Sequence, residues 1–474
     1  MTVDGLYEAA ADAAIQRRAF RSGELPVAVY GLGKMGLPLA AVYAETCGSV
    51  IGVDVDPTVV DTIAAGKCHV RGEPGLSSLV AEQVESGRLC ATIDGTVAAK
   101  EAAIHVVIVP TLLTDDDEPD LSRIDAVLSD VASGLSPGDL VILESTVPPG
   151  TTREAVCPTL VERSGLDPGT FGVAFCPERT ASGTALRDIR GQYPKVVGGV
   201  DDESARAAAL CYDVLTDAPV HVVSDATTAE AVKVFGGVYR DVNIALANEL
   251  ATLACDLDIS VREAIETANH VPTFDIHDPG PGVGGHCIPY YPYFLREAAD
   301  RELQLSPTAR RINDGMPAET VAMLESALES DGQPLETASV VVLGITYRAG
   351  VAETRAAPAV EIIDQLSRRG VSVAATDPLV DPEAFGATPL GIEELYGESF
   401  DAAVLVTAHE EFRRIDWDRV EPLVVVDGRD ALDLDDTRHT VYTLGGTSDT
   451  GPVVYAEEPS GVAIPGRSEL SGSE

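Results

Sequence analysis

The sequence has few lysines and is poor in basic residues overall. Its 474 residues include 33 Lys and Arg against 76 Asp and Glu, which gives a formal net charge of −43. A surface with this charge repels phosphate backbones and anionic lipid, which excludes nucleic acid and membrane surfaces as favoured partners. The acidity is spread along the whole chain. Because concentrated salt screens such self-repulsion, we expect a halophilic protein.

Paired cysteines and long apolar segments are also missing. No two of the eight cysteines have C-x-x-C spacing, so we expect no disulfide framework and no metal site. No run of about 18 apolar residues occurs, which argues against a membrane span. The N-terminus has no basic start followed by an apolar run, so we expect no signal peptide and a cytoplasmic protein.

The sequence does contain an alternation of short β-branched runs with helical stretches. Runs typical of buried parallel strands occur at 27–33, 50–56, 103–110, 140–146, 172–178, 338–348, 371–378, 401–412 and 422–430. From Asp225 to about Asp300 the strand patterns stop and a long helical stretch appears. This order predicts an α/β protein with two Rossmann-like doubly wound domains joined by a long central helix.

A glycine motif follows the first predicted strand. Gly31, Gly33 and Gly36 form G-x-G-x-x-G between that strand and a helical run, where a pyrophosphate can approach the backbone and the helix N-terminus. Asp54 ends the next strand, at a position that suits a ribose 2′-hydroxyl and repels a 2′-phosphate. The motif therefore favours NAD over NADP. A glycine-rich turn that binds no nucleotide is the alternative.

Two further residues stand out on chemical grounds. Cys287 lies in GPGVGGHCIP (280–289), a loop with little side-chain bulk, and is either a nucleophile or a small buried residue. His286 is adjacent, but neighbours in an extended loop point apart. Lys233 lies on an apolar helical stretch with Arg240 two turns further on. It is either a cation for an oxyanion or diphosphate, or a side chain whose ammonium reaches the surface.

Several longer motifs carry a family resemblance. Among them are GLGKMGLPLA (31–40), ESTVPPGTT (144–152), FCPER (175–179), AEAVK (229–233) and PGPGVGGHCIP (279–289). From about Pro26 to about Gly445 the chain resembles the UDP-glucose/GDP-mannose dehydrogenase family, most closely its branch that oxidises UDP-N-acetyl-D-mannosamine.

The resemblance implies an NAD-dependent, four-electron oxidation of the sugar C6 alcohol to a uronate. Cys287 is then the nucleophile that forms a thiohemiacetal and a thioester, Lys233 stabilises the C6 oxyanions, and Glu178 positions the hydrolytic water. The alternatives are a UDP-glucose or UDP-N-acetylglucosamine 6-dehydrogenase, a two-electron alcohol dehydrogenase, and a catalytically impaired nucleotide-sugar-binding protein.

The resemblance also implies binding residues and domain roles. The expected NAD contacts are Gly31, Gly33, Met35, Gly36, Asp54, Thr111, Thr146 and Arg355. The expected UDP-sugar contacts are Arg179, Thr180, Lys233, Arg240, Gly284, Tyr347 and Arg348. We expect an N-terminal extension (1–23), an NAD-binding domain (24–224), a central helical dimerisation domain (225–330), a UDP-sugar-binding domain (331–446) and a disordered acidic tail (447–474). A homodimer formed through the central helix and a role in polysaccharide biosynthesis complete the expectation.

The chain departs from the family pattern near these residues. The family usually has Asn four residues after the lysine and Asp four residues after the cysteine, where this chain has Gly237 and Tyr291. A His-Pro-Arg before the glycine loop is replaced by 271–273, and a Lys in the second half by Arg348. A variant subfamily that uses Tyr291 or Asn243 in place of the lost groups is one interpretation. A slow enzyme, or one that acts on another sugar, is the other.

Overall fold

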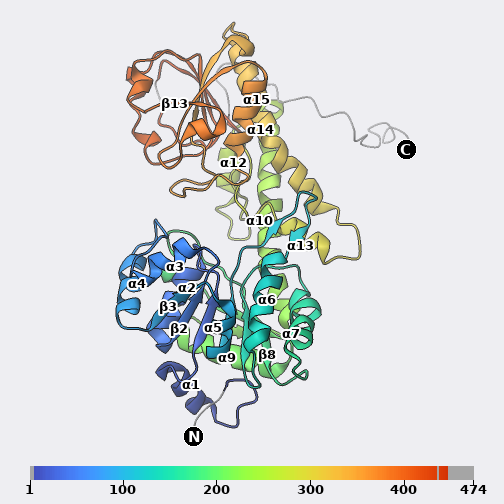
Figure 1. Ribbon diagram of the computed structural model, residues 1–474. Helices are drawn as coiled ribbons and strands as arrows, with labels where there is room; N and C mark the ends of the chain where they lie inside the picture. The colour runs from blue at the N-terminus through green and yellow to red at the C-terminus, as the bar shows by residue number, and fades with distance from the viewer. Residues whose placement is uncertain (1–4, 435–436, 447–474) are drawn as a thin grey trace, which may run out of the picture. The chain divides into compact units, whose positions relative to one another are not determined.

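The computed structural model describes residues 5–434 and 437–446 (Figure 1). The chain separates into two compact units. The first unit comprises Met1–Val242 and Gly285–Arg310, and the second comprises Asn243–Gly284 and Arg311–Glu474. The segment 225–330 is thus divided between the units, and the five-part division given above stays a prediction. The expected acidic tail, 447–474, lies outside the described residues.

The first unit is built on an eight-stranded sheet in the order β10-β9-β8-β7-β4-β1-β2-β3. Its strands are β1 Val27–Tyr30, β2 Val50–Val53, β3 Leu89–Thr92, β4 Ile104–Val107, β7 Leu140–Leu143, β8 Gly172–Phe175, β9 Lys195–Gly199 and β10 Val220–Val222. All neighbours pair in parallel except β8 and β9. The strand order reverses between β1 and β4, which is where doubly wound sheets bind ligands.

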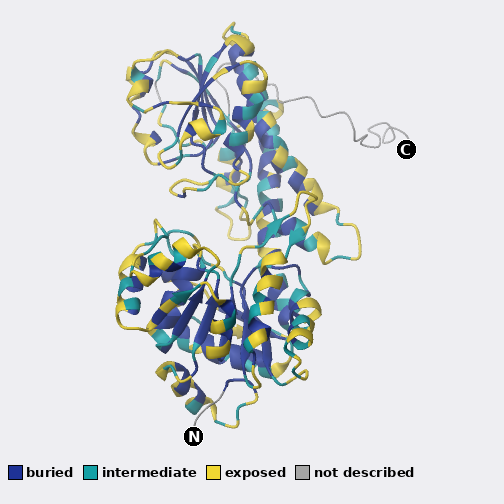
Figure 2. Ribbon diagram, viewed as in Figure 1, coloured by how far each residue is buried: buried dark blue, intermediate teal, exposed yellow. Residues whose placement is uncertain are grey.

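Helices cover both faces of this sheet, and Figure 2 shows most of its strands as buried. Val27 and Val29 of β1 pack into one apolar core, while Ala28 and Tyr30 point into the other. The first core is closed by α1 Ala13–Ser22, α2 Gly36–Cys47, α3 Pro57–Ala64, α4 Leu76–Glu85 and α9 Asp202–Leu215. The second is closed by α5 Gly95–Glu101, α6 Ser122–Gly134 and α7 Cys157–Ser164. Burial on both faces explains why β1 reads as continuously apolar.

The second unit has a six-stranded, fully parallel sheet in the order β13-β12-β11-β14-β15-β16. Its strands are β11 Ser339–Leu343, β12 Ser372–Thr376, β13 Thr388–Pro389, β14 Ala402–Leu405, β15 Val424–Asp427 and β16 Thr440–Thr443. One face packs against α14 Leu305–Ser330 and α15 Pro358–Arg368. The other is covered by loops and short 3-10 turns, η5 Glu394–Tyr396, η6 Phe412–Arg414 and η7 Trp417–Arg419. The predicted α/β class with two Rossmann-like sheets is confirmed.

The predicted central helix is α10, Ala226–Thr252, followed by α11 Ala254–Leu257, α12 Val261–Ala268 and α13 Tyr291–Glu297. The predicted strands correspond to β1, β2, β4, β7, β8, β11, β12, β14 and β15. Helix α14, which contains Pro317, lies within the region expected to be helical (225–330), but its bounds were not predicted. Strands β3, β9, β10, β13 and β16 were not predicted either, nor was the hairpin of β5 Leu112–Leu113 with β6 Pro119–Asp120. None of the helices in the described ranges combines the length and hydropathy needed to cross a bilayer.

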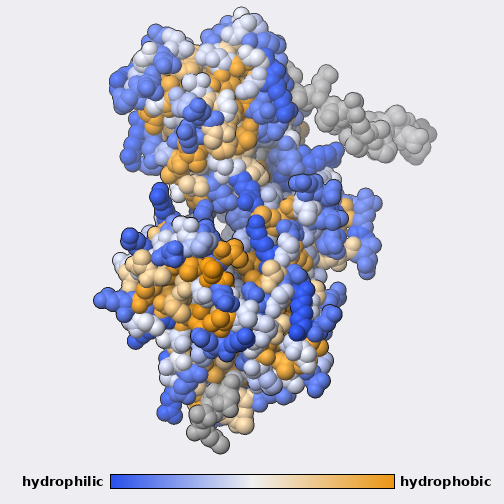
Figure 3. Space-filling model, viewed as in Figure 1, coloured by the Kyte–Doolittle hydropathy of each residue, from blue (hydrophilic) through white to orange (hydrophobic). Residues whose placement is uncertain are grey.

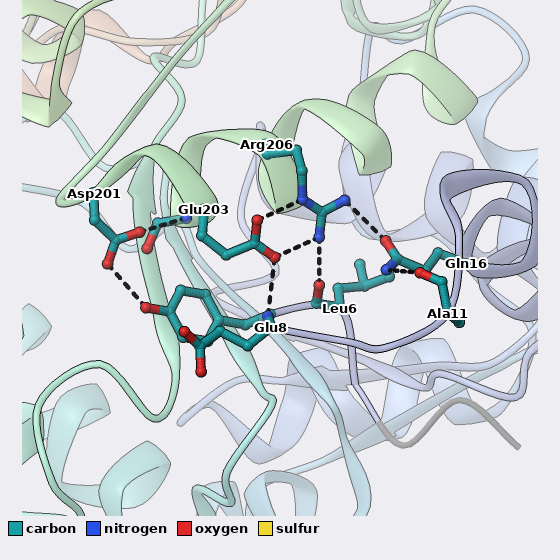
Figure 4. A network of polar contacts seen from close by, with 9 residues as sticks. Leu6, Glu8, Ala11, Gln16, Asp201, Glu203 and Arg206 are labelled. Carbon is teal, nitrogen blue, oxygen red and sulfur yellow. Dashed lines mark hydrogen bonds and ion pairs between the residues drawn. The ribbon is translucent and has the colours of Figure 1, made fainter.

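The start of the described chain is tied to α9 by a polar network (Figure 4). The Arg206 guanidinium donates to the main-chain oxygen of Leu6 at 2.8 Å, to Gln16 Oε1 at 2.9 Å and to both oxygens of Glu203. Glu203 in turn accepts from the main-chain N–H of Glu8 at 2.9 Å. Leu6 and Phe20 are fully buried. The extension therefore belongs to the first unit's core rather than lying loose on it.

Candidate active site

The first turn of the first unit has the geometry of a nucleotide-binding loop. Gly31 has φ +97° and donates its N–H to Val53 O at 2.8 Å. A Cβ at Gly31 would lie 2.7 Å from Ile108 O, and one at Gly36 would lie 1.8 Å from Gly31 O. A Cβ at Gly33, by contrast, would meet nothing within 4 Å. Packing therefore requires glycine at positions 31 and 36. Gly33 leaves open space beside the N-terminus of α2, where a pyrophosphate fits.

Asp54 stands directly after β2 at this same edge of the sheet. Its Oδ2 accepts the N–H of Leu32 at 2.8 Å and its Oδ1 the N–H of Asp56 at 3.0 Å. Val55 beside it is 93% exposed, and Ile93, after the neighbouring β3, is 61% exposed. Figure 3 shows apolar surface over this side of the first unit. A carboxylate in this position can bind a ribose, and the exposed apolar side chains beside it can cover an adenine base.

The loops after β4 and β7 supply Thr111 and Thr146, which the structure brings together. Thr111 Oγ1 donates to the main-chain oxygen of Thr146 at 2.7 Å. The loop that follows Thr146 is held against α10, because Glu230 accepts the N–H groups of Gly150 and Thr152 at 2.6 and 2.7 Å. Glu230 is fully buried. It was not singled out in the sequence, although AEAVK contains it.

The three residues expected to carry catalysis meet in the first unit. The Lys233 ammonium, on α10, donates to the main-chain oxygen of Glu178 and lies 3.6 Å from Glu178 Oε2. Both side chains are mostly buried, at 14% and 16% exposure. Lys233 also acts electrostatically on the thiol of Cys287, which comes from the loop before α13. A thiol, an ammonium and a carboxylate from three separate segments therefore share one site.

The charges at this site favour the thiolate form of Cys287. Desolvation of the sulfur raises the pKa of Cys287. The hydrogen bond and charge of His286 and the charge of Lys233 lower this pKa by a larger amount, so the net pKa falls below its usual value. For Lys233 desolvation lowers the pKa, but Tyr291, Glu178 and Cys287 raise it above the usual value. The residue Cys287 is solvent-exposed. The site thus pairs a thiol of lowered pKa, on a residue that is exposed as a whole, with an ammonium that stays charged.

His286 corrects the expectation that it would point away from Cys287. The segment is a bend that leads into a turn rather than an extended strand, because Tyr290 and Tyr291 both donate their N–H groups to Cys287 O at 3.1 Å. The imidazole therefore reaches the neighbouring sulfur.

Tyr291 and Asn243, the two candidates to replace the missing amide and carboxylate, lie in different places. Tyr291 contacts the site through its hydroxyl, which lies within hydrogen-bonding reach of Thr146 and Cys287. Asn243 belongs to the second unit, where its amide donates to Asp275 O at 2.6 Å and its oxygen accepts from His277 N at 2.9 Å. Asn243 is thus engaged with a backbone loop, and Tyr291 is the residue beside the sulfur.

The expected substrate contacts fall into two groups. In the first unit, Arg179 donates to Pro194 O, and Thr180 Oγ1 lies 2.9 Å from the sulfur of Met35, which links the FCPER segment to the nucleotide turn. Arg240 is exposed on α10. In the second unit Gly284 packs on Tyr347, since a Cβ there would lie 2.6 Å from that of the tyrosine. Arg348 is exposed in the same unit, as is Arg355, which was expected to contact NAD rather than the sugar.

A buried lysine on which a buried glutamate acts electrostatically was not singled out in the sequence. Lys195 is 5% exposed and lies over the ring of Tyr212, 5.4 Å from its centroid. Tyr212 donates its O–H to Glu144 at 2.6 Å. Desolvation lowers the pKa of Lys195, but the charge of Glu144 raises this pKa by a larger amount. The side chain therefore stays protonated as an ammonium. Two features of the sequence could have indicated these residues. Lys195 is one of only five lysines, and Glu144 is the first residue of ESTVPPGTT.

Comparison with protein families identifies three matching regions. The NAD-binding domain of the UDP-glucose/GDP-mannose dehydrogenase family matches residues 25–216. The central domain of the same family matches residues 227–315. Its UDP-binding domain matches residues 341–434. The matches follow the chain order of the two sheets and the helices between them, and they make NAD the cofactor of this chain.

Individual relatives agree with this assignment. The UDP-N-acetyl-D-mannosamine dehydrogenase of Pyrococcus horikoshii is 36% identical over 411 residues, which covers 86% of this chain and 96% of the relative. The NDP-N-acetyl-D-galactosaminuronic acid dehydrogenase of Ralstonia nicotianae is 35% identical over 415 residues, which covers 85% and 95%. A solved structure of a Pyrococcus horikoshii UDP-N-acetyl-D-mannosamine dehydrogenase has a TM-score of 0.83 at 35% identity and covers 89% of this chain and 99% of its own.

Proposed function

Because the chain belongs to the UDP-glucose/GDP-mannose dehydrogenase family, we propose that it oxidises C6 of UDP-N-acetyl-D-mannosamine to the carboxylate through Cys287. The observation that carries the proposal is the meeting of Cys287, Lys233 and Glu178 in one site, with the pKa of the thiol held low. The turn at Gly31 to Gly36 and the carboxylate of Asp54 would hold the NAD. When bound, NAD accepts one hydride in each of the two oxidations.

The residues of the site divide the reaction between them. The first oxidation takes a hydride from C6 and passes the hydroxyl proton to water, which leaves an aldehyde. The Cys287 thiolate adds to this carbon, and the Lys233 ammonium stabilises the resulting oxyanion. Loss of the second hydride from C6 gives a thioester. A water positioned by Glu178 attacks the thioester carbon and releases the uronate and the thiolate.

The stoichiometry of NADH tests this scheme. Full-length protein with NAD in molar salt should form two NADH per sugar, with UDP-N-acetyl-D-mannosamine preferred over UDP-glucose, UDP-N-acetylglucosamine and UDP-N-acetylgalactosamine. Cys287→Ala should abolish uronate formation. Cys90→Ala, at another exposed cysteine, is the matched control and should keep it. Undiminished uronate formation by Cys287→Ala would rule out the thioester route.

A second candidate is a nucleotide-sugar-binding protein with impaired catalysis. Gly237 and Tyr291, where the family usually has Asn and Asp, favour it. It predicts that calorimetry detects binding of the UDP-sugar while no NADH forms over long incubation. One NADH per sugar, independent of Cys287, would instead indicate a two-electron alcohol dehydrogenase.

We further propose a homodimer formed through α10, which acts in the cytoplasm of a halophile and supplies uronate for polysaccharide. The helix carries exposed apolar side chains at Phe235, Tyr239 and Leu246, which are 57%, 52% and 48% exposed. Apolar residues of this size on one helix indicate a surface that association would bury. Light scattering in molar salt should give about twice the chain mass of 49.6 kDa, and Leu246→Glu should lower the measured mass.

A further inference from the structure

Two adjacent glycines on α10 have very different surroundings. Gly236 is exposed, and a Cβ there would meet nothing within 4 Å. Gly237 is buried, and a Cβ there would lie 1.8 Å from Cδ2 of Tyr291 and 2.7 Å from its Cε2. Glycine is a poor residue for a helix interior. At 237 the absent side chain has a packing consequence, since the tyrosine ring occupies its place.

The ring has little freedom to move away from the helix. Tyr291 is 6% exposed and packs with Val234 and Phe294, whose ring centroid is 6.1 Å away. Its N–H donates to Cys287 O at 3.1 Å, so the phenol and the thiol project from the same turn. Gly237 therefore determines where the Tyr291 hydroxyl lies relative to the sulfur.

The hydroxyl lies among three polar side chains, namely Thr146, Lys233 and Cys287. A phenol has one hydrogen to donate and two lone pairs to accept with. Lys233 can only donate, and burial raises the pKa of Tyr291 above its usual value, so the phenol keeps its proton. The consistent assignment is that Thr146 and Lys233 donate to the phenol oxygen, and the single O–H donates to the sulfur of Cys287.

We propose that Tyr291 is a catalytic residue that donates a hydrogen bond to the Cys287 thiolate, and that Gly237 is the positioning residue that admits its ring. The inference rests on the proposed function in taking Cys287 as the reacting group. The other groups that act on the sulfur are His286 and Lys233, with Glu178 beside Lys233. A neutral donor at 291 stabilises the thiolate without the second negative charge that a carboxylate would bring.

The test is the pH dependence of Cys287 alkylation by iodoacetamide, followed on its peptide by mass spectrometry in the full-length protein. Tyr291→Phe keeps the ring and removes the O–H. It should raise the apparent pKa of Cys287 by about one unit, which slows alkylation up to tenfold below that pKa. Tyr290→Phe, the neighbouring tyrosine, is the matched control and should leave the pKa unchanged. A tyrosine that only fills space would give the wild-type pKa in both variants.

The glycine pair gives the second test. Gly237→Ala places a methyl group on the ring and should raise the Cys287 pKa as Tyr291→Phe does, while Gly236→Ala should not. Tyr291→Phe combined with Gly237→Ala should be no worse than Gly237→Ala alone, because the hydrogen bond is already lost. If Gly237→Ala does not fold, Gly237→Ala with Tyr291→Ala should restore folding by removing the ring. Equal behaviour of the two glycine variants would overturn the positioning role.

The alkylation measurement needs no sugar, so it remains decisive if the proposed dehydrogenase activity is absent. With an active enzyme, Tyr291→Phe should shift the acid limb of the kcat/KM profile to higher pH by the same amount as the alkylation pKa. An unchanged profile together with an unchanged alkylation pKa would refute the inference and leave the proposed function standing.

Discussion

The two units open their sheets with closely similar turns. Gly31 after β1 and Gly344 after β11 have φ +97° and +87°, and each donates its N–H to the last residue of the neighbouring strand, at 2.8 and 2.9 Å. An aspartate follows that strand in both cases. Asp54 accepts the N–H of Leu32 at 2.8 Å, and Asp377 accepts the N–H of Ile345 at 2.7 Å.

The units differ two residues after the glycine. Gly33 leaves space in which a Cβ would meet nothing within 4 Å. Thr346 fills the corresponding position, and its hydroxyl contacts Asp377 Oδ2 at 3.2 Å and His409 Nε2 at 2.7 Å. The Asp377 side chain is 0% exposed. The same backbone turn therefore leaves its space open for a ligand in the first unit and closes it with internal hydrogen bonds in the second.

The largest expected effect is on folding of the second unit. Asp377→Ala removes the partner of His409 and of three main-chain N–H groups, and should lower the free energy of unfolding by about 3 kcal/mol. Denaturant unfolding in molar salt measures it. Asp54→Ala, at a partly exposed acid, is the matched variant and should cost about 1 kcal/mol or less. Equal losses of unfolding free energy in the two variants would contradict the difference between the two turns.

The pH dependence of stability should be next in size. Burial raises the pKa of Asp377, but its hydrogen bonds with His409 and with N–H groups lower this pKa by a larger amount. The result is a pKa of about 2, compared with an ordinary 3.8. A lowered folded-state pKa stabilises the protein above the unfolded-state pKa, and this contribution is lost as pH falls from about 4 to about 2. It amounts to about 2 kcal/mol. Unfolding free energies of wild type and Asp377→Asn should therefore converge over that range.

A smaller effect is expected on cofactor affinity. Asp54→Ala should weaken NAD binding about tenfold, since the ribose loses a charged hydrogen-bond acceptor. Isothermal calorimetry on the folded variant measures it. Thr346→Gly, which opens the second turn without supplying the rest of the site, should leave NAD affinity unchanged. A gain of a second NAD site in that variant would show that the side chain at 346 alone separates the two turns.

The smallest expected effect concerns Gly33. Gly33→Ala should change the free energy of unfolding by no more than about 0.5 kcal/mol, because its methyl group enters open space. NAD affinity should nevertheless fall, since we propose that this space receives the pyrophosphate. Gly36→Ala is the contrasting variant, because its Cβ would lie 1.8 Å from Gly31 O. Comparable destabilisation by both variants would contradict the open-space interpretation.

The sequence predicted most of the strands whose side chains are buried on both faces, although it did not predict the fully buried β9. Runs such as Val27–Tyr30 and Val424–Asp427 are unbroken and apolar because helices or turns cover both sides. Strands β3, β10 and β13 are only partly buried or exposed and so lack that signature. The bounds of α14 were not predicted within the expected helical region 225–330, since Pro317 lies inside the helix, in a place that propensity alone disfavours.

The site was predictable in its residue types and less so in its contacts. Strand, glycine spacing and Asp54 indicated the nucleotide turn directly, whereas the roles of Cys287, Lys233 and Glu178 came from the family resemblance. The orientation of His286 depends on a turn that its neighbours do not specify. The contact of Gly237 with Tyr291 joins a helix to a distant loop, and no local pattern in either segment encodes it.

The distribution of lysine has a practical consequence. Lys195 and Lys233 are 5% and 14% exposed, while Lys34, Lys67 and Lys100 are exposed in the first unit. The second unit has no lysine anywhere in its sequence. Amine-reactive dyes and acylating metabolites will therefore modify side chains of the cofactor half alone. A single labelling reaction would give a fluorescent reporter confined to one half of the enzyme, with no engineered cysteine.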